Sequence, residues 1–212
     1  MTASNSFAKK SETVRYVALG DSYTIGTGGT PQDSWPAVLT RHLHSRGIAI
    51  ELTANLGRNG WTTRDVIAYQ LPIFKSLNST FATLLIGVND WVQGADCATF
   101  QKNFKFLLDE ILRKLPDKHR LLLVTLPDFS MMPVGNQFSD GRSISKGIDE
   151  FNAVIKQEAR ARGLAVVDIN PFSKTMGTNL KLIASDGLHP SAQGYAQWEK
   201  LIFPEAEKIL RK

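Results

Sequence analysis

Short apolar runs alternate along this chain with longer amphipathic stretches. The apolar runs are rich in branched and aliphatic side chains, as is usual for strands that helices cover on both faces. We predict strands over residues 14–19, 48–54, 83–86, 120–126 and 165–169. Strands that alternate with helices are typical of an α/β fold with a mainly parallel sheet.

The amphipathic stretches are predicted to be helices. They cover residues 35–45, 63–70, 99–115, 145–162 and 191–210. Ser34 stands where it could cap the first of them, and Gly163 stands where a helix commonly ends. We expect Pro204 to break or kink the last helix, because proline has no backbone N–H to donate.

These elements predict a three-layer α/β/α sandwich around a five-stranded, mainly parallel sheet. Residues 14–212 are expected to form a single domain, and residues 1–13 a flexible N-terminal segment. Residues 127–141 and 171–186 show no helix or strand pattern, and loops of such length in a compact domain are often functional. Ligands of open α/β sheets bind outside the carboxyl ends of the strands, so reactive residues are expected there.

Composition narrows the class of protein. Of the 212 residues, 42% are hydrophobic and 21% are charged, which suffices for a core without disulfides or metal. The formal net charge is +5, but Lys and Arg cluster only at Lys9-Lys10 and Arg211-Lys212. A solvated, mildly basic surface is therefore expected, and no nucleic-acid partner.

No stretch of the chain has the pattern of a signal peptide or a membrane span. Residues 1–13 contain no apolar h-region, and no apolar run reaches the length that crosses a bilayer. A cytoplasmic location is the default expectation, unless a leader has been removed. Nothing in the sequence determines the oligomeric state, which is compatible with a monomer.

Cysteine and histidine offer no metal site. The single cysteine, Cys97, allows no internal disulfide and is expected to pack as a small apolar side chain. The histidines are His42, His44, His119 and His189, and no His, Asp or Glu cluster has the spacing of zinc ligands. We therefore expect neither a metal nor another cofactor.

A candidate nucleophile follows the first predicted strand, in Gly20-Asp21-Ser22. A serine just past a strand end has its hydroxyl at the carboxyl edge of the sheet. The G-x-S-x-G elbow of α/β-hydrolases is not matched, because residue 24 is threonine. Taken alone, Ser22 could equally be the serine of a turn or a helix cap.

Two further segments follow predicted strands. After the second strand, Gly57 and Gly60 permit a tight turn whose amides face a site. After the third strand, Asn89 could aim its side-chain amide at a developing oxyanion. Taken separately, the first reads as an ordinary strand-to-helix turn, and the second as an Asx-turn or helix cap.

The most informative segment is Asp186-Gly187-Leu188-His189-Pro190. A residue before proline is disfavoured in a helix, so His189 is expected in a fixed loop. Asp186 could accept the Nδ1 proton of His189, which leaves Nε2 free to take a proton from a serine. A purely structural histidine is the alternative, and the Asp partner argues against it. Asp21 and Asp90 lack this short tether to His189 and are expected to be structural.

Four blocks stand in one order along the chain: Gly20-Asp21-Ser22, Asn55 to Gly60, Gly87-Val88-Asn89-Asp90 and Asp186 to Pro190. Each is weakly specific, but the set resembles the SGNH, or GDSL-type, hydrolase superfamily, and within it bacterial lysophospholipase-like or small-ester hydrolases. The resemblance implies a flavodoxin-like fold and a single SGNH-type hydrolase domain over residues 14–212.

The resemblance also implies roles for particular residues. Ser22 would be the nucleophile, His189 the general base and acid, and Asp186 the residue that orients His189. The backbone N–H groups of Ser22 and Gly60, with the Asn89 side chain, would form the oxyanion hole. Gly60 is preferred to Gly57 because the family's donor glycine corresponds to the second of the pair.

Large apolar side chains near these blocks could line a substrate pocket. Trp61 and Trp91 directly follow Gly60 and Asp90, and the loop after the fourth strand carries three more candidates: Phe129, Met131 and Met132. Packing against the sheet edge or anchoring a loop would explain them equally well. If they line a pocket, they favour a small-molecule ester with a lipid-like or aryl group; acetyl esters also remain candidates.

Three functions remain open from the sequence. The first is a serine esterase that forms an acyl-Ser22 intermediate, and the second is a thioesterase or acyltransferase that uses the same site. The third is a non-catalytic, flavodoxin-like binding module. Such a module would not need Ser22, Asn89 and the Asp186–His189 pair together, and no G-x-G-x-x-G nucleotide pattern follows a strand.

Overall fold

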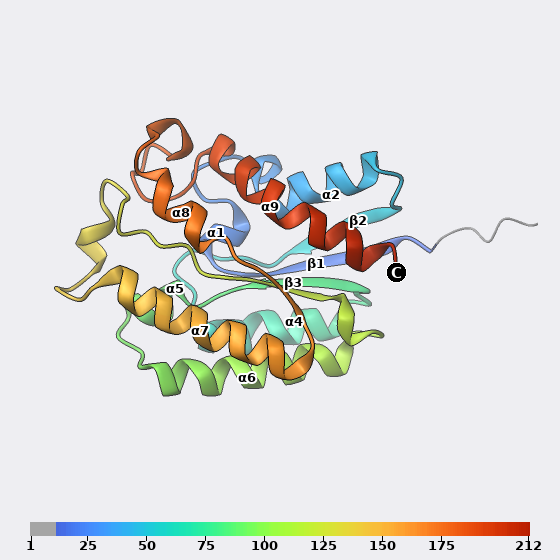
Figure 1. Ribbon diagram of the computed structural model, residues 1–212. Helices are drawn as coiled ribbons and strands as arrows, with labels where there is room; N and C mark the ends of the chain where they lie inside the picture. Colours follow the sequence, from blue (N-terminus) through green and yellow to red (C-terminus); the bar gives the residue numbers. More distant parts are fainter. Residues whose placement is uncertain (1–11) are drawn as a thin grey trace, which may run out of the picture.

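A computed structural model describes residues 12–212 of the chain (Figure 1). The flexible N-terminal segment is predicted over residues 1–13, and residues 1–11 of it lie outside the described residues. Within residues 12–212, each helix is either too short or too polar to cross a lipid bilayer.

The described residues form one sheet of five strands, all of them parallel to their neighbours. The strands are β1 (Val14–Gly20), β2 (Ile50–Asn55), β3 (Phe81–Leu85), β4 (Leu121–Val124) and β5 (Ala165–Val167). Their order across the sheet is β2-β1-β3-β4-β5, which is the flavodoxin-like order. The predicted fold class is confirmed.

Helices cover both faces of this sheet. They are α1 (Ser22–Ile25), α2 (Trp35–Ser45), α3 (Thr63–Asp65), α4 (Leu71–Ser76), α5 (Val88–Val92), α6 (Cys97–Lys114), α7 (Ile144–Arg162), α8 (Asn170–Met176) and α9 (Ala192–Leu210). Helices α2 and α9 lie on one face, and α4, α6 and α7 lie on the other (Figure 1). The remaining helical segments are one π-helix and several short 3-10 helices. The π-helix is η2 (Val66–Gln70), and the 3-10 helices are η1 (Pro31–Asp33), η3 (Lys118–Arg120), η4 (Gly135–Phe138) and η5 (Leu180–Leu182).

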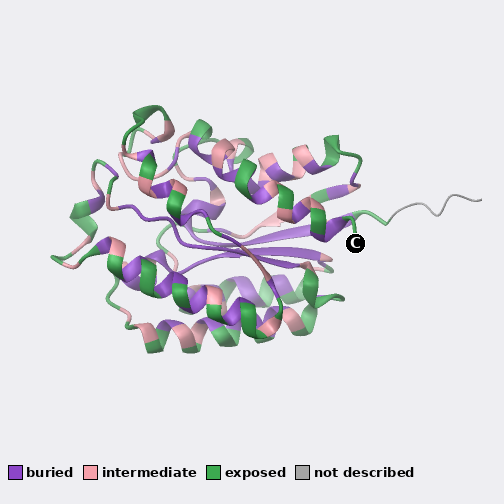
Figure 2. Cartoon of the chain, in the orientation of Figure 1, coloured by how far each residue is buried: buried purple, intermediate pink, exposed green. Residues whose placement is uncertain are grey.

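Burial follows these layers. The strands lie in the interior, and the outward faces of the helices are exposed (Figure 2). Every residue of β3 and β4, the strands in and next to the middle of the sheet, is buried. Continuous apolar strands of this kind are what a parallel sheet covered on both faces requires.

Two predictions about local structure were wrong, and one predicted helix is longer than expected. Pro204 does not end the last helix, since α9 runs from Ala192 to Leu210. Pro204 is exposed, so the carbonyl that loses its partner can bind water, while Trp198 and Ile202 anchor the opposite face in the core. Residues 171–186 are not structureless, because they contain most of α8 and all of η5. The helix predicted over 63–70 continues through η2 and α4 as far as residue 76.

The strand order places one point of the sheet apart from the rest. Strand β1 pairs with β2 on one side and with β3 on the other. The connection from β1 to β2 goes toward one edge of the sheet, and the later strands are added toward the other edge, so the order of the strands switches between β1 and β3. In doubly wound sheets, ligands bind at this switch point, beyond the carboxyl ends of the strands. Helices α1 and α5, which follow β1 and β3, lie at that end of the sheet (Figure 1).

Candidate active site

Ser22 is the first residue of α1, two residues beyond the end of β1. The turn between them depends on Gly20, whose φ of +156° is rare for residues with a side chain. A Cβ at Gly20 would lie 2.2 Å from Thr24 Oγ1 and 2.3 Å from the carbonyl oxygen of Leu85. Only glycine therefore fits the passage from strand to helix that presents Ser22.

Hydrogen bonds hold this turn from both sides. The side chain of Gln70 accepts from the Gly20 N–H at 3.0 Å and donates to the Gly20 carbonyl at 2.6 Å. Asp21 caps α1, since its Oδ1 accepts from the Tyr23 N–H at 3.0 Å. Burial raises the pKa of Asp21 to about 8, although the bond from Tyr23 opposes the shift.

The structure brings Ser22, His189 and Asp186 together. His189 Nε2 lies 2.9 Å from Ser22 Oγ, and His189 Nδ1 lies 2.7 Å from Asp186 Oδ2. With the proton on Nδ1, the ring donates to the carboxylate, and Nε2 accepts from the serine hydroxyl. This is the geometry in which a histidine can take the serine proton.

Asp186 is held as a carboxylate by its own loop. Its Oδ1 accepts from the backbone N–H groups of Leu188, at 2.9 Å, and His189, at 3.0 Å. Partial burial alone would raise the pKa of Asp186, but these bonds and the His189 ring outweigh it and lower the pKa below its usual value. Asp186 therefore stays charged at neutral pH.

The histidine loop is also anchored to the rest of the molecule. Its backbone doubles back, so that the Ala184 N–H donates to the His189 carbonyl at 2.8 Å. Gly187 makes the bend possible with a φ of +71°. The ring of Tyr23, on α1, packs against the His189 ring at a centroid distance of 5.2 Å. These contacts restrict the orientation of His189.

Asn89 and Gly60 lie beside Ser22. The Asn89 Nδ2 donates to the Trp61 carbonyl at 2.9 Å, which ties α5 to the turn that carries Gly60. The Gly60 carbonyl accepts from Gln93 Nε2 at 3.2 Å. Within residues 12–212, neither the Ser22 N–H nor the Gly60 N–H donates to another protein group. Both are available to a ligand.

Asp90 holds the start of α3 next to α5. Its carboxylate accepts from the Thr63 N–H at 2.8 Å and from the Thr63 hydroxyl. Burial raises the pKa of Asp90, and the bonds from Thr63 oppose that shift. Asp90 thus joins the first turn of α3 to α5, and it does not contact His189.

Gly57 and Gly60 have different structural roles. A Cβ on Gly57 would lie 2.5 Å from the Ile25 nitrogen and 2.7 Å from the Asp21 carbonyl oxygen, so Gly57 allows close packing against α1. Gly60 has open space around it and a φ of +77°. Only Gly60 of the two lines the cleft next to Ser22.

A cleft of about 250 Å³ opens onto these groups. Its polar lining comprises Ser22, Asn59, Gly60, Asn89 and His189. Its remaining lining is apolar or aromatic and comprises Tyr23, Val88, Val92, Phe129, Phe138 and Leu188. A mostly apolar cleft with a few converging polar groups is the usual form of a small-molecule site.

Of the five pocket residues predicted from the sequence, only Phe129 lines this cleft. Trp91 is buried behind it, with its ring edge-on to Phe129 at 5.9 Å. Trp61 packs on Tyr69, whereas Met131 is 54% exposed and Met132 is buried beside a different, much smaller cavity.

Most of the apolar lining was not predicted from the sequence. Three of the lining residues are direct chain neighbours of site residues predicted from the sequence: Tyr23 of Ser22, Val88 of Asn89, and Leu188 of His189. Their positions in the chain could therefore have indicated that they line the cleft. Val92 lies one turn after Asn89 on α5. Phe138, in η4, had no such signal, because the path of its loop was not predictable.

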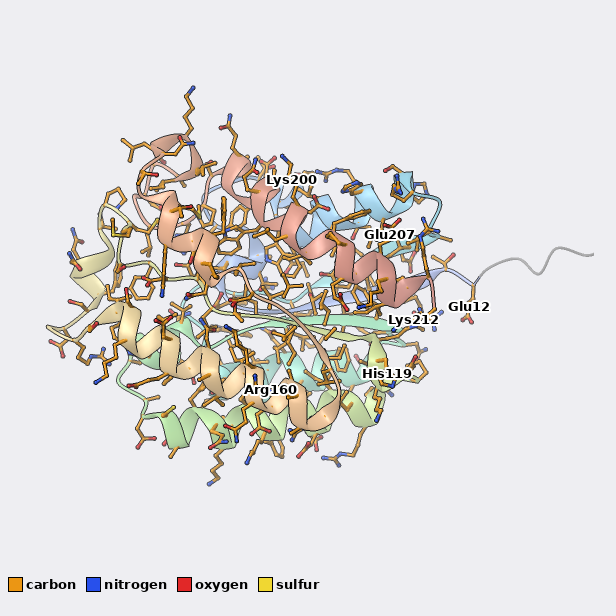
Figure 3. The ribbon with its side chains drawn as sticks, viewed as in Figure 1. Glu12, His119, Arg160, Lys200, Glu207 and Lys212 are labelled. Carbon is orange, nitrogen blue, oxygen red and sulfur yellow. The ribbon has the colours of Figure 1, made fainter. Side chains whose placement is uncertain are left out.

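The other histidines are not part of this site. His42 Nδ1 lies 2.9 Å from the buried Glu199, and its ring stacks on Phe203. His119 is exposed at the same end of the molecule as Glu12 and Lys212 (Figure 3). In the described part of the chain, no group of three or more His, Cys, Asp or Glu side chains is arranged to hold a metal ion.

Comparison with known proteins shows the family of this chain. A family model for the GDSL-like lipase/acylhydrolase family matches residues 18–197, which include every block described above. The chain belongs to this family. The resemblance inferred from the sequence blocks is thereby confirmed, and the protein is an enzyme that acts on ester bonds.

Individual proteins resemble this chain over most of their length. The spore germination lipase LipC of Bacillus licheniformis is 25% identical over 210 residues, which cover 89% of this chain and 95% of that protein. The lipase/acylhydrolase from Enterococcus faecalis superposes with a TM-score of 0.71 at 23% identity, over 92% of this chain and 96% of the other. The family 3 carbohydrate esterase of Clostridium thermocellum superposes with a TM-score of 0.75 at 22% identity, over 94% and 98%.

Proposed function

We propose that this GDSL-family enzyme is a serine esterase that cleaves carboxylic esters through an acyl-Ser22 intermediate, within one hydrolase domain over residues 14–212. The observation that carries the proposal is the chain of contacts from Asp186 through His189 to Ser22, at 2.7 and 2.9 Å. It ends at a cleft that Gly60 and Asn89 also line.

In the first half of the reaction, Ser22 Oγ attacks the ester carbonyl carbon while its proton passes to His189 Nε2. The carbonyl oxygen becomes an oxyanion, which accepts from the N–H groups of Ser22 and Gly60 and from the Asn89 side chain. The carbon–oxygen bond to the alcohol then breaks, and the leaving oxygen takes the proton from His189. An acyl-Ser22 ester remains.

In the second half, water attacks the acyl carbon, and His189 Nε2 takes one of the water protons. The second tetrahedral intermediate collapses, the bond to Ser22 Oγ breaks, and the proton returns to Ser22. The acid is released. Asp186 accepts from Nδ1 throughout, which holds the ring in the productive tautomer and stabilises its positive charge.

The size of the cleft supports a short or medium acyl group. A volume of about 250 Å³ lies below the range of roughly 300–1,000 Å³ that drug-sized ligands occupy. The apolar side chains beside Ser22 suit an alkyl or aryl group better than a charged one. We propose lipid-like, aryl or acetyl esters as substrates, and the similar proteins include a lipase and a carbohydrate esterase.

The proposal is tested with p-nitrophenyl esters of increasing acyl length. Wild-type protein is expected to hydrolyse the short and medium esters, and Ser22→Ala and His189→Ala to lose at least about a thousandfold in kcat. Ser76→Ala and His119→Ala are matched controls, because both side chains are exposed and remote from the cleft. A Ser22→Ala enzyme with a near-normal rate would refute the mechanism.

Mass spectrometry checks the intermediate separately. Rapid quenching of wild-type protein with a slowly hydrolysed ester should show the added acyl mass on the peptide that contains Ser22. An acyl group on any other residue, such as Cys97, would contradict the proposed nucleophile.

A further inference from the structure

The side chain of Arg142 donates hydrogen bonds to backbone carbonyls of two separate segments. It lies between η4 and α7 and is half-buried. Its Nη1 donates to the Trp91 carbonyl at 2.7 Å, and its Nη2 donates to the Val92 carbonyl at 3.0 Å. Its Nε donates to the Ser139 carbonyl at 3.2 Å. One guanidinium thus joins the last turn of α5 to the loop that follows β4.

The same guanidinium lies over an aromatic ring. Its central carbon is 4.2 Å from the centroid of the Trp91 ring, which is a close cation–π contact. The ring is also held against α7, since a Cβ on Gly147 would lie 1.6 Å from Trp91 Nε1. Trp91 is therefore in close contact with both Arg142 and the backbone of α7, and it in turn supports Phe129.

These contacts join two walls of the cleft. One wall is the α5 face that carries Val88 and Val92, and the other is the loop that carries Phe129 and Phe138. Arg142 bonds to the carbonyl of Val92 on the first wall and to Ser139, next to Phe138, on the second. The Arg142 side chain thus bridges the two walls.

The reacting groups are anchored independently. Asn89, at the start of α5, is held by its bond to the Trp61 carbonyl, and Asp90 is held by Thr63. Neither of these bonds involves Arg142. Removing the Arg142 side chain is therefore expected to loosen the apolar walls and leave the oxyanion donor in place.

We propose that Arg142 is a positioning residue that sets the width of the apolar cleft between α5 and the loop after β4, and thereby selects the acyl groups that bind. This inference rests on the proposed function, because it assigns that cleft to the acyl group of the ester. It requires arginine in particular. Lysine has one charged nitrogen, and it cannot bond to three carbonyl groups in a fork or lie flat on an indole ring.

The first test compares acetate and hexanoate p-nitrophenyl esters with wild type, Arg142→Met and Arg142→Lys. We expect the ratio of kcat/KM for hexanoate to that for acetate to fall about tenfold in both variants, mainly through KM, since lost apolar contact with a chain costs this much. The kcat for acetate should stay within about threefold of wild type, because Asn89 remains anchored. Arg160→Met is the control, since Arg160 is exposed on the outer face of α7 (Figure 3).

The second test needs no catalysis. In Ser22→Ala protein, calorimetry measures the binding of acetate, butyrate, hexanoate and octanoate with and without Arg142→Met. The gain in affinity with chain length should be reduced in the double variant. Gly147→Ala, which displaces Trp91 from the opposite side and places a better helix former in α7, should reduce it as well.

The outcomes separate the two proposals. If esters are not hydrolysed but Arg142→Met still weakens the binding of the longer carboxylates, the esterase proposal fails and the role of Arg142 stands. If wild type is an esterase and its acyl-length profile is unchanged in folded Arg142→Met protein, the role of Arg142 is refuted. An equal loss for acetate and hexanoate would also refute it, because that result indicates general damage.

Discussion

Replacement of Asn89 by alanine tests the oxyanion site directly. Asn89 Nδ2 carries two N–H groups, and one of them donates to the Trp61 carbonyl at 2.9 Å. The other remains for a ligand, in a cleft that Ser22 and Gly60 also line. Alanine removes both N–H groups and leaves the two backbone donors unchanged.

The magnitude follows from the number of donors. Loss of one of three oxyanion donors costs about 2.7–4 kcal/mol in the transition state, which corresponds to roughly 10²–10³ in kcat. KM should change little, because the neutral ester carbonyl binds the donor more weakly than the oxyanion does. The lost bond to Trp61 should lower the free energy of unfolding by about 1 kcal/mol.

The assay is steady-state hydrolysis of p-nitrophenyl acetate, with urea unfolding of the same preparations. Asn59→Ala is the matched control, because Asn59 lines the same cleft but its Oδ1 accepts from the Thr27 hydroxyl. Its kcat is expected to stay close to wild type. A fall of less than about threefold in folded Asn89→Ala protein, or an equal fall in both variants, would refute the assignment of Asn89 as an oxyanion donor.

Two further predictions concern stability. Because burial raises the pKa of Asp21 from 3.8 to about 8, the folded state retains a proton that the unfolded state loses between these values, so wild-type stability should fall as pH rises through that range. Asp21→Asn keeps the cap to Tyr23 without the charge, so the free energy of unfolding of this variant, measured in urea, should rise relative to wild type as pH rises. A difference in the free energy of unfolding that does not change with pH would contradict this reasoning. Gly57→Ala should cost about 3 kcal/mol or more, because the new Cβ would meet backbone atoms of α1. Gly60→Ala should cost only about 1–2 kcal/mol for its positive φ, and a reversed order in urea unfolding would show that the close approach of Gly57 is not rigid.

Much of the site could be predicted because the relevant information is local. Each of Ser22, Gly60 and Asn89 follows a strand, and the carboxyl ends of parallel strands share one edge of the sheet. Asp186 and His189 are three residues apart, so their contact needs only a short loop. Residue type and chain position were sufficient in these cases.

Other features depended on contacts that no local pattern encodes. Phe138 and Arg142 lie in a long loop whose position depends on contacts with α5. Phe138 lines the same cleft as Val92, and Arg142 donates to the Val92 carbonyl. Helix α8 is too short to show a clear period of apolar residues, and it is stabilised by burial of its inner face. Pro204 is tolerated in α9 because its side of the helix faces solvent, which sequence position alone does not reveal.

By itself, the sequence predicted the fold class, the approximate positions of the strands and the candidate reactive residues, because hydrophobic period and short motifs report on neighbours in the chain. Only the tertiary structure decided which side chains form the cleft and how wide it is. Ser22 and His189 are separated by 167 positions, yet their atoms lie 2.9 Å apart. Such a distance results from the packing of all the layers, and the contacts of Trp91 and Arg142 beside the cleft likewise join segments that are distant in the chain.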